Sequence, residues 1–571
     1  MELFKKFLVI AFIAGVLSPV LKAQVDKQNI PEILNTFKQG GISAEDTYLQ
    51  MKAVYENGRI HKCASPLYMF AHKHKSEISP ALLQNQDRNF KNKSNLPTYT
   101  SPSGKFVLTY ETTGENAIPS GDANANGFPD YVEWAGVAAD SSYNYLVNTL
   151  GFADPIPDGE TYDISFEELQ GTYGFTQTIG GSGPGTRIGI ENDFAGFPNN
   201  DDPDGNQRGA LRVTIAHEIK HAIQFAQNDF NGEADSWAEM DATLAEEVVY
   251  DIVNDYYNYL GGSADVFGNP GVTVTPGSYE DITWALYFHE KIGVDFWPAA
   301  WSRIENSVTD LPLLDAVDQE LTSRGLDYTE SLQELYTWHF ASGAYRNANF
   351  GFDESLFYPT PNAQKTETQV TDQFSSNISL GRFASYFLNV KPPASQTGDV
   401  SVLIDTDSPD ISLAVVGIFK DGTVAFEYAE FESGFFVVNE GWKWEDIERV
   451  GAIVLNENRN STQSFTIRVS DSFPTSIPFE DDKPSITQLK QNYPNPFNPS
   501  TTIPVSISEF QKVKVDIYDI TGRLVQSVFN GNLPQGTHAL SVNLERFASG
   551  VYMYRLQTND QVQIKRMTLV K

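Results

Sequence analysis

Two histidines and a glutamate stand within five positions near the middle of the chain, as His217-Glu218-Ile219-Lys220-His221. Side chains four residues apart share one face of an α-helix, so the two imidazoles can bind a single metal ion. Glu218 follows the first histidine directly and projects towards the open side of that ion, where its carboxylate can accept a proton from bound water. The motif therefore predicts a zinc site that carries its own general base.

The residues around this motif predict a largely buried helix. Apolar side chains recur through LRVTIAHEIKHAIQFA, which spans residues 211–226. Two histidines on a buried helix need polar partners, and a metal ion supplies them. The alternative interpretation is that both are core histidines, hydrogen-bonded to neighbouring groups.

A third zinc ligand is expected on the next helix, because a catalytic zinc ion usually has three protein ligands and leaves its fourth position to water. Residues 233–260, EADSWAEMDATLAEEVVYDIVNDYYNYL, have a helical pattern, and we predict that Glu239 in the first turn is that ligand. Glu239 also fits a capping box, in which its carboxylate would instead reach the backbone N–H of Ser236. Further candidates for the ligand are Glu233, Asp235 and Glu246.

These two segments together resemble a known family. AHEIKHAIQFA followed by SWAEMDATLAEEVVYD is similar to the gluzincin class of zinc metallopeptidases, and more narrowly to secreted bacterial metalloproteases with the pattern HExxHAxQ and then W-x-E-x-x-A. The resemblance covers roughly residues 60–345. It implies a zincin-like domain in which His217, His221 and Glu239 hold zinc and Glu218 is the general base.

The chemistry that follows is hydrolysis of peptide bonds, since zinc lowers the pKa of its bound water to about 7 and polarises the scissile carbonyl. Glu218 would remove the proton and later deliver it to the leaving amine. Charge on the tetrahedral oxygen needs a further donor, and Tyr279 and His289 are candidates, although both fit a helix core as well. Thr243 departs from the resemblance, because some relatives carry there an Asp that orients a histidine ligand.

A second motif predicts a calcium site. DANANGFPDYVE, residues 122–133, matches the loop pattern D-x-[DN]-x-[DN]-G-x5-E, in which Gly127 permits the sharp turn. The expected ligands are Asp122, Asn124, Asn126, the backbone carbonyl of Phe128, Asp130 and Glu133. We expect an isolated structural calcium loop at the start of a helix, and the alternative is an Asx-rich turn that caps the helix without metal.

The N-terminus predicts export. Lys5 and Lys6 precede the apolar run 7–17, and Leu21-Lys22-Ala23 is a plausible cleavage site, so residues 1–23 are typical of a signal peptide. No other stretch approaches about 18 apolar residues, and we therefore expect no membrane span.

Cys63 is the single cysteine of the chain and lies upstream of the expected catalytic domain. A thiol placed there suggests a latency ligand, whose sulfur occupies the fourth zinc position until the segment is cut away. The alternative role is that of a small buried hydrophobic side chain, which is common for a free cysteine.

The net charge of −34, from 74 acidic and 40 basic residues, favours solubility and cation binding. An acidic excess of this size opposes nucleic acid and anionic membrane surfaces as partners.

The hydrophobic pattern predicts a multidomain α+β chain. Residues 24–100 are interpreted as a pro-segment or N-terminal helical subdomain, and 101–360 as the zinc metalloprotease domain. Within it, TRIGIENDF at 186–194 is the expected edge strand that pairs with an extended substrate. Strand patterns then predict a β-sandwich over 370–470, followed by a linker at 471–488.

The last segment carries a second resemblance. QNYPNPFNPSTTIPVSI, VKVDIYDITGRLVQSV, ASGVYMYRL and IKRMTLVK, all within residues 489–571, are similar to the C-terminal sorting domain of type IX secretion. The resemblance implies a small Ig-like β-sandwich, interaction with the type IX secretion machinery, and passage across the outer membrane to the surface or the medium.

Two classes of function follow. The favoured one is a secreted zinc endopeptidase that hydrolyses extracellular protein or peptide substrates, with Zn²⁺ and Ca²⁺ as cofactors. The other is a catalytically silent surface or adhesion protein on a metalloprotease scaffold. Intact Glu218 favours the enzyme, because a scaffold would not need a carboxylate at that position. An aminopeptidase is a third idea, but the chain shows no amine-recognition motif.

Overall fold

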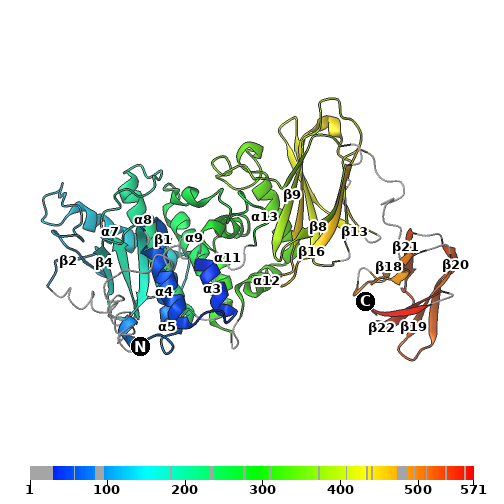
Figure 1. Cartoon of the computed structure of the whole chain (residues 1–571), viewed down its shortest axis with the longest axis horizontal. Helices are drawn as coiled ribbons and strands as arrows, with labels where there is room; N and C mark the ends of the chain where they lie inside the picture. The colour runs from blue at the N-terminus through cyan, green and yellow to red at the C-terminus, as the bar shows by residue number, and fades with distance from the viewer. Residues whose placement is uncertain are drawn as a thin grey trace, which may run out of the picture. The chain divides into compact units, whose positions relative to one another are not determined.

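The computed structural model describes residues 30–571 apart from short gaps, and divides them into two compact units (Figure 1). The gaps are 57, 84–94, 180–182, 231–236, 274–277, 308–310, 371–372, 407, 433–434, 439–440, 472–485, 493–494, 509–510, 534–535 and 559–560. The predicted signal peptide, most of the predicted linker, and Glu233, Asp235 and Ser236 lie outside the described residues. The first unit comprises Met1–Asn269, Val274–Ser331 and Phe352–Thr360, and the second comprises Pro270–Thr273, Leu332–Gly351 and Pro361–Lys571.

The first unit combines one six-stranded sheet with helices that precede its strands, lie between them and follow them in the sequence. Its strands are β1 His61–Cys63, β2 Thr98–Thr100, β3 Phe106–Thr109, β4 Tyr162–Glu167, β5 Thr172–Thr178 and β6 Thr186–Glu191. Its α-helices are α3 Ile30–Lys38, α4 Ala44–Tyr55, α5 Ser65–Lys73, α7 Asp130–Tyr143, α8 Asn206–Asn228, α9 Ala238–Tyr250, α10 Ile282–Tyr287, α11 Phe296–Glu305 and α12 Leu313–Ser323. Short π or 3₁₀ turns are η1 Asn144–Thr149, η3 Asp255–Tyr259, η4 Tyr279–Asp281 and η5 Phe288–Ile292.

The strand order of this sheet is β1-β5-β6-β4-β3-β2. Strand β6 pairs antiparallel with β5 and parallel with β4, so it lies inside the sheet. The prediction that 186–194 forms the substrate-binding edge was therefore wrong. The physical reason is that all six residues of β6 are buried, as in an interior strand, and sequence alone does not tell which neighbours a buried strand acquires.

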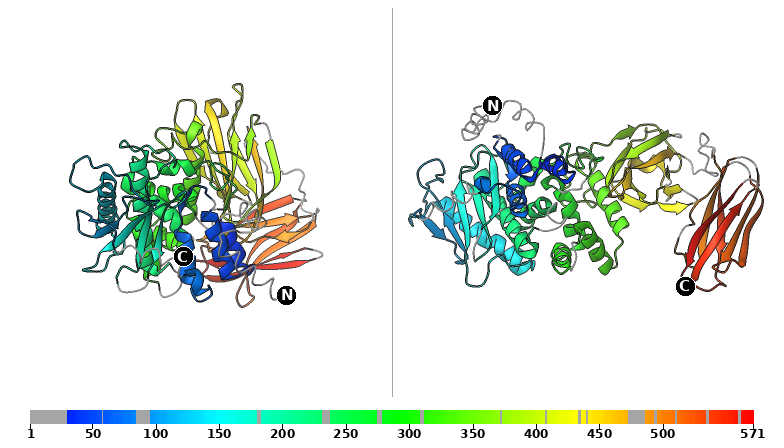
Figure 2. Two further views of the ribbon diagram at one scale, coloured as in Figure 1. Left: turned by 60° about the vertical axis from the view of Figure 1, so that its left-hand side comes forward. Right: turned by 60° about the horizontal axis from the view of Figure 1, so that its bottom comes forward.

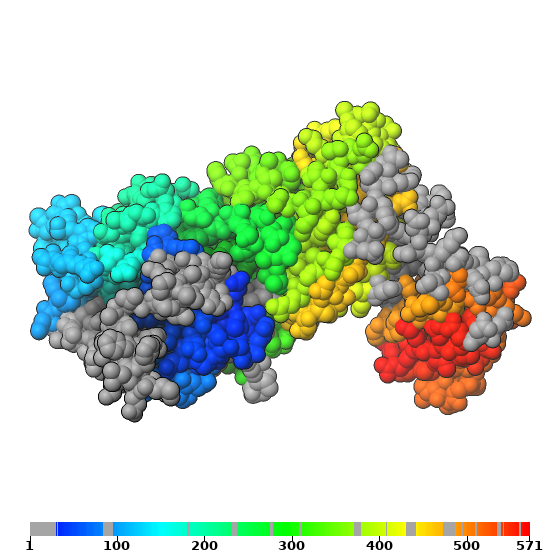
Figure 3. Space-filling model, in the orientation of Figure 1, coloured from blue at the N-terminus to red at the C-terminus, as the bar shows by residue number. Residues whose placement is uncertain are grey.

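The outer strand next to β5 comes from the N-terminal segment. Strand β1 pairs parallel with β5, with His61 opposite Thr172 and Cys63 opposite Gly174. Helices α3, α4 and α5 share a hydrophobic core with Phe175 of β5. Figure 3 shows these residues in blue, packed against the teal and green part of the same unit. The N-terminal segment is thus built into the sheet of the first unit.

Helix α8 lies on this sheet and contacts β5, β6, α7 and α9. A glycine permits the close approach. A Cβ atom at Gly174 of β5 would lie 2.7 Å from Cγ2 of Thr214 and 3.2 Å from Cγ of Glu218. Because Gly174 has no side chain, the face of α8 that bears Glu218 can rest directly on β5.

Helix α9 is shorter than the pattern predicted. The predicted helix over 233–260 ends at Tyr250, and the chain turns through Asn254, whose φ of +54° is left-handed. Asparagine tolerates that conformation because its short polar side chain can hydrogen-bond locally. The turn brings Asp255 into the interior, where its carboxylate pairs with Lys62, and this long-range pairing has no signature in the local pattern.

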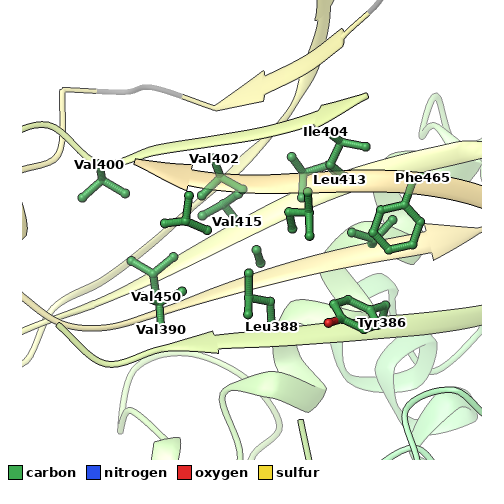
Figure 4. Close-up of a cluster of buried hydrophobic side chains, with 14 of the residues drawn as sticks. Tyr386, Leu388, Val390, Val400, Val402, Ile404, Leu413, Val415, Val450 and Phe465 are labelled. Atoms are coloured by element: carbon green, nitrogen blue, oxygen red, sulfur yellow. The ribbon is translucent and has the colours of Figure 1, made fainter. Parts of the chain in front are cut away.

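The second unit contains two five-stranded sheets, with strand orders β13-β14-β10-β16-β8 and β12-β11-β15-β9-β7. Their shared core includes Tyr386 and Leu388 of β9, Ile404 of β10 and Phe465 of β16 (Figure 4). The strands are β7 Lys365–Glu367, β8 Gln373–Leu380, β9 Ala384–Val390, β10 Ser401–Asp405, β11 Ile411–Phe419, β12 Val424–Tyr428, β13 Glu430–Glu432, β14 Phe435–Val438, β15 Ile447–Asn456 and β16 Gln463–Ser470. Helix α13 Tyr328–Phe340 and the turns η6 Gly343–Tyr345 and η7 Trp444–Asp446 also contribute residues to this unit.

The C-terminal part of the second unit forms a further pair of small sheets, coloured orange to red in Figure 2, with orders β17-β18-β21 and β20-β19-β22-β23. Its strands are β17 Gln488–Leu489, β18 Ser500–Ile507, β19 Gln511–Asp519, β20 Leu524–Leu533, β21 Gly536–Asn543, β22 Gly550–Gln557 and β23 Val562–Leu569. Ile503, Val515, Tyr554 and Met567 belong to one buried core that joins both sheets. The molecule is therefore α+β, with a β-rich C-terminal region.

None of the helices described here is long and apolar enough to cross a membrane.

Candidate metal centre

Helix α8 places His217 and His221 on one buried face, as the four-residue spacing requires. Their Nε2 atoms lie 3.1 Å apart, and both side chains are at most 1% exposed. Glu239, in the first turn of α9, lies opposite them. Its Oε2 is 3.4 Å from Nε2 of His217, and its Oε1 is 3.2 Å from Nε2 of His221. The three side chains predicted as ligands therefore converge.

Cys63 of β1 completes this cluster. Its Sγ lies 3.4 Å from Nε2 of His221, and the backbone N–H of Ser65 donates a hydrogen bond to it. One ligand atom from each of Cys63, His217, His221 and Glu239 lies within 4.8 Å of the other three. Strand β1 and helix α8 thus each contribute side chains to the same cluster.

The donor set and its spacing fit a zinc ion. Zinc takes Cys sulfur, His nitrogen and carboxylate oxygen in tetrahedral arrangements, with bonds of roughly 2.0–2.3 Å. Ligand atoms of such a tetrahedron lie roughly 3.3–3.8 Å apart. The distances of 3.1–3.4 Å between the imidazoles, Glu239 and Cys63 are close to that range. The chemistry of the four donors and these distances are thus compatible with a zinc site.

Without a metal ion, a proton on His217 supplies the positive charge of the cluster. Burial lowers the pKa of His217, but the carboxylates of Glu239 and Glu246 outweigh burial and raise that pKa to about 10. Burial likewise raises the pKa of Glu239, yet His221 and His217 hold it well below its usual range. The cluster is thus an electrostatic site for positive charge, and a metal ion that binds must displace this proton.

Each histidine is oriented by a partner on its other ring nitrogen. Nδ1 of His217 lies 2.7 Å from Oε1 of Glu246, and Nδ1 of His221 lies 2.8 Å from Oε1 of Gln224. Since a carboxylate and an amide oxygen only accept, both Nδ1 atoms must carry the proton. Once His217 loses the proton at its Nε2, each Nε2 lone pair faces the cluster, as a metal ligand requires. Thr243 instead donates its hydroxyl to the backbone carbonyl of Glu239.

Glu246 belongs to a buried charge network. Lys62 of β1 lies 2.7 Å from Glu246 and also pairs with Asp255, and the side chains of all three are at most 2% exposed. Tyr173 donates its hydroxyl to Asp255 and lies under the Lys62 ammonium. Burial lowers the pKa of Lys62, but the two carboxylates raise it above its usual value, so the ammonium stays charged. Lys62 therefore supports the residue that orients His217.

The expected general base lies against strand β5. Oε2 of Glu218 accepts hydrogen bonds from the hydroxyls of Ser65, at 2.9 Å, and Thr176, at 2.8 Å. Its Oε1 is buried and has no hydrogen-bond partner among the described residues. Burial raises the pKa of the Cys63 thiol, and the negative charges of Glu218 and Glu239 raise it further, which reflects how closely the three groups lie.

The two candidate transition-state donors lie in different places. Burial raises the pKa of Tyr279, as do the charges of Glu280, Glu239 and Cys63, so its hydroxyl stays protonated close to the cluster. His289 lines a pocket with Leu146, Lys220, Asp241 and Trp297, and no cluster residue is among the described lining of that pocket.

The predicted calcium loop closes on itself. Oε1 and Oε2 of Glu133 accept hydrogen bonds from the side-chain amides of Asn126 and Asn124, and Asp122 accepts from the backbone N–H groups of Asn126 and Gly127. Gly127 has a φ of +90°, as the turn requires. Asp130 accepts from the backbone N–H of Ala123, and Phe128 donates its N–H to Asn126. Loop positions 1, 3, 5 and 12 thus face one another.

Several residues of the metal centre were missed by the sequence. Gln224 stands three residues after His221, on the same helix face, and this spacing could have identified it. Glu246 was considered only as a ligand. Lys62, Ser65, Thr176 and Asp255 reach the site through pairing between distant segments, and no local pattern marks them.

Comparison with known proteins bears on the C-terminus. Residues 491–570 match the secretion system C-terminal sorting domain. No curated protein matches the chain. Among solved structures, PorZ of Porphyromonas gingivalis is similar at 18% identity over 18% of this chain and 14% of its own, with a TM-score of 0.12. Dimeric latent PorU of Porphyromonas gingivalis is similar at 16% identity over 35% and 20%, with a TM-score of 0.15.

A β-glucuronidase of Faecalibacterium prausnitzii is similar at 10% identity over 33% of this chain and 37% of its own, with a TM-score of 0.11. The chain therefore spans well under half the length of each of these three structures. The sorting domain indicates export across the outer membrane by the type IX machinery, to the cell surface or the medium. The C-terminal segment of this chain is thus a type IX secretion sorting domain.

Proposed function

We propose that the first unit is a zinc-dependent endopeptidase that hydrolyses extracellular proteins or peptides. The observation that carries this proposal is the convergence of His217, His221 and Glu239 beside the carboxylate of Glu218. Two imidazoles and one carboxylate are a common ligand set of catalytic zinc. A neighbouring Glu that binds no metal is suited to act as a base. Export by the sorting domain places such an activity outside the cell.

In this proposal His217, His221 and Glu239 hold the ion. When bound, zinc supplies a Lewis acid that activates water and polarises the scissile carbonyl. Glu218 accepts the proton of the attacking water at its unpartnered Oε1, while Thr176 fixes Oε2. The same carboxylate then returns the proton to the leaving amine. Tyr279 donates its hydroxyl to the developing oxyanion.

A catalytically silent surface protein is the second candidate, and one observation favours it. Cys63 adds a fourth protein ligand, and zinc sites with four protein ligands are typically structural. Against this, a structural site has no need of Glu218, held with one oxygen unpartnered beside the cluster. We therefore place the endopeptidase first.

We also propose that residues 122–133 bind calcium. Support comes from the clustering of these side chains, since the amide groups of Asn124 and Asn126 both contact the carboxylate of Glu133 and Asp122 accepts from the backbone N–H of Asn126. The ion would replace the hydrogen bonds that now hold Glu133 to the two amides. It would fix the start of α7 without entering the hydrolytic chemistry.

The test uses the secreted protein as recovered from the medium. We expect about one zinc per chain in both the wild type and Glu218→Gln, and loss of hydrolysis of roughly a hundredfold or more in the variant, since a base is removed but no ligand. Glu305→Gln, on the exposed face of α11, is the matched control and should leave hydrolysis unchanged. Internal fragments of a denatured substrate identify an endopeptidase. Zinc-free wild-type protein, or full activity of Glu218→Gln, contradicts the proposal.

A further inference from the structure

Strand β1 and the start of α5 contact the ligand set, the expected base and the sheet beside them. Cys63 reaches the position of a fourth ligand, and Ser65 is hydrogen-bonded to the expected base. The same short segment adds a strand to the sheet beside α8. These three contacts are independent of one another, yet they come from neighbouring residues.

At the sheet, β1 covers the side of β5 that faces away from β6. The backbone N–H of His61 donates to the carbonyl of Gly171, and that of Ala64 donates to the carbonyl of Gly174. An extended peptide that binds a protein by strand addition needs free backbone groups of this kind. With β1 in place, the carbonyl of Gly174 in β5 and that of Gly171 just before it are already occupied.

At the metal position, Sγ of Cys63 closes the ligand set. Catalytic zinc sites keep one position open for water or substrate, whereas a set of four protein ligands leaves none. At the base, Ser65 accepts a hydrogen bond from the backbone N–H of Thr176 and donates its own proton to Oε2 of Glu218. The serine hydroxyl is thereby fixed on the carboxylate that must meet the attacking water.

The segment is held in place by buried contacts. Lys62 lies between His61 and Cys63 in β1. Its ammonium pairs with Glu246 and Asp255 and lies over the ring of Tyr173. Breaking a buried charge pair is unfavourable, so β1 will not leave the sheet by thermal fluctuation alone. Its placement beside the metal centre is a stable feature of the intact chain.

We propose that residues 61–65 are an internal inhibitor of the metal centre, with Cys63 as the fourth zinc ligand of the intact chain. This inference rests on the proposed endopeptidase. The intact chain is then latent, and hydrolysis begins when β1 is displaced from β5. Displacement opens the fourth zinc position, removes Ser65 from beside the Glu218 carboxylate and exposes the backbone of β5 to a peptide in one event.

The first test is spectroscopic and does not depend on activity. The intact chain is purified without zinc and loaded with one equivalent of Co²⁺, which takes tetrahedral sites similar to those of zinc. Cys63 is the only cysteine, so a thiolate-to-cobalt charge-transfer band reports on that residue alone. We expect the band in wild type and in Glu218→Gln, and its loss in Cys63→Ala and Cys63→Ser with the tetrahedral cobalt bands retained.

Cobalt bound without a thiolate band overturns the inference and leaves the metal centre intact. Failure to bind cobalt at all contradicts the proposed function itself. The serine variant keeps the size of the side chain, so it tests ligation even if the alanine variant does not fold.

The second test measures hydrolysis by the intact chain. We expect Cys63→Ser to be at least about tenfold more active than wild type, because the fourth position is no longer held by a strong protein ligand. Glu56→Gln, at an exposed position after α4 and outside residues 61–65, is the matched control and should stay at the wild-type level. Equal, measurable activity of the intact wild-type chain and of the chain from which residues 61–65 have been removed, with the cobalt band present in the intact chain, overturns latency and supports a closed structural site. If the chain remains inactive even after the segment is removed, the endopeptidase proposal fails, while the cobalt band still identifies Cys63 as a metal ligand.

Discussion

The candidate metal centre and the predicted calcium loop differ in where their polar side chains come from along the chain. The loop gathers its donors from twelve consecutive residues on the surface. The metal centre gathers Cys63, His217, His221 and Glu239 from three elements in the interior. A local site needs only the correct turn, whereas a buried one needs the whole unit to fold and every charge to find a partner. The two sites should therefore respond very differently to substitution.

The largest difference is expected for charge. Lys62→Met leaves Glu246 and Asp255 buried without their cation, which should lower the free energy of unfolding by about 3–5 kcal/mol. Lys52→Met removes the exposed pair with Glu56 and should cost well under 1 kcal/mol. Urea unfolding of both variants measures the contrast. Equal losses would show that the Lys62 network is no more important than a surface pair.

The second prediction concerns orientation of the ligands. Glu246→Gln keeps the shape but weakens the hydrogen bond to Nδ1 of His217, so zinc affinity should fall about 10–100-fold. Thr243→Val removes only a bond to the backbone of Glu239 and should change zinc affinity far less. Competition with a chelator gives both values. A larger effect of Thr243→Val would show that Glu246 is not the residue that orients the ligands.

The third prediction concerns the exposed loop. Calcium that binds only the folded state should stabilise it by roughly 1.4–2.7 kcal/mol at 10–100 times its Kd. Glu133→Gln should abolish that gain while leaving zinc content unchanged, because the loop and the metal centre share no ligand. Thermal unfolding with calcium or a chelator provides the measurement. Unchanged stability in both conditions favours the metal-free Asx turn.

The fourth prediction is a pH dependence of the metal centre. In the metal-free protein the pKa of His217 is raised to about 10, above its unfolded value of roughly 6.5. Its contribution to stability is therefore complete below about pH 6.5 and disappears as the pH rises towards 10. Since zinc must displace this proton, apparent zinc affinity of Cys63→Ser should rise about tenfold per pH unit between roughly pH 7 and 10. The affinity of the wild type should rise more steeply, because Cys63 must also lose its thiol proton to bind. An affinity that does not change with pH would place the proton elsewhere.

The sequence predicted the residues that lie close together along the chain better than those that meet only in the folded unit. The residues of the loop at 122–133 could be named in advance, because they all lie in one turn, while calcium binding by this loop stays a prediction. His217, Glu218 and His221 were equally accessible, since helical spacing alone places them. Glu239 required the following helix, and the structure brings it to the histidines as predicted.

The remaining parts of the metal centre depend on tertiary pairing. The sequence raised Cys63 as a ligand from its position upstream, but only the pairing of β1 with β5 brings its sulfur to His221. The same pairing explains why 186–194 does not form the edge of the sheet. Asp255 was expected within a continuous helix, and its contact with Lys62 arises because α9 ends at Tyr250. Long-range contacts of this kind leave no periodic pattern in a single sequence.

The most direct test of the metal centre is X-ray absorption at the zinc edge of the intact, zinc-loaded chain. We predict two imidazole nitrogens and one carboxylate oxygen at roughly 2.0–2.2 Å, and one sulfur at about 2.3 Å. A shell of oxygen alone, with no imidazole scattering, would contradict the assignment of His217, His221 and Glu239 as the metal ligands.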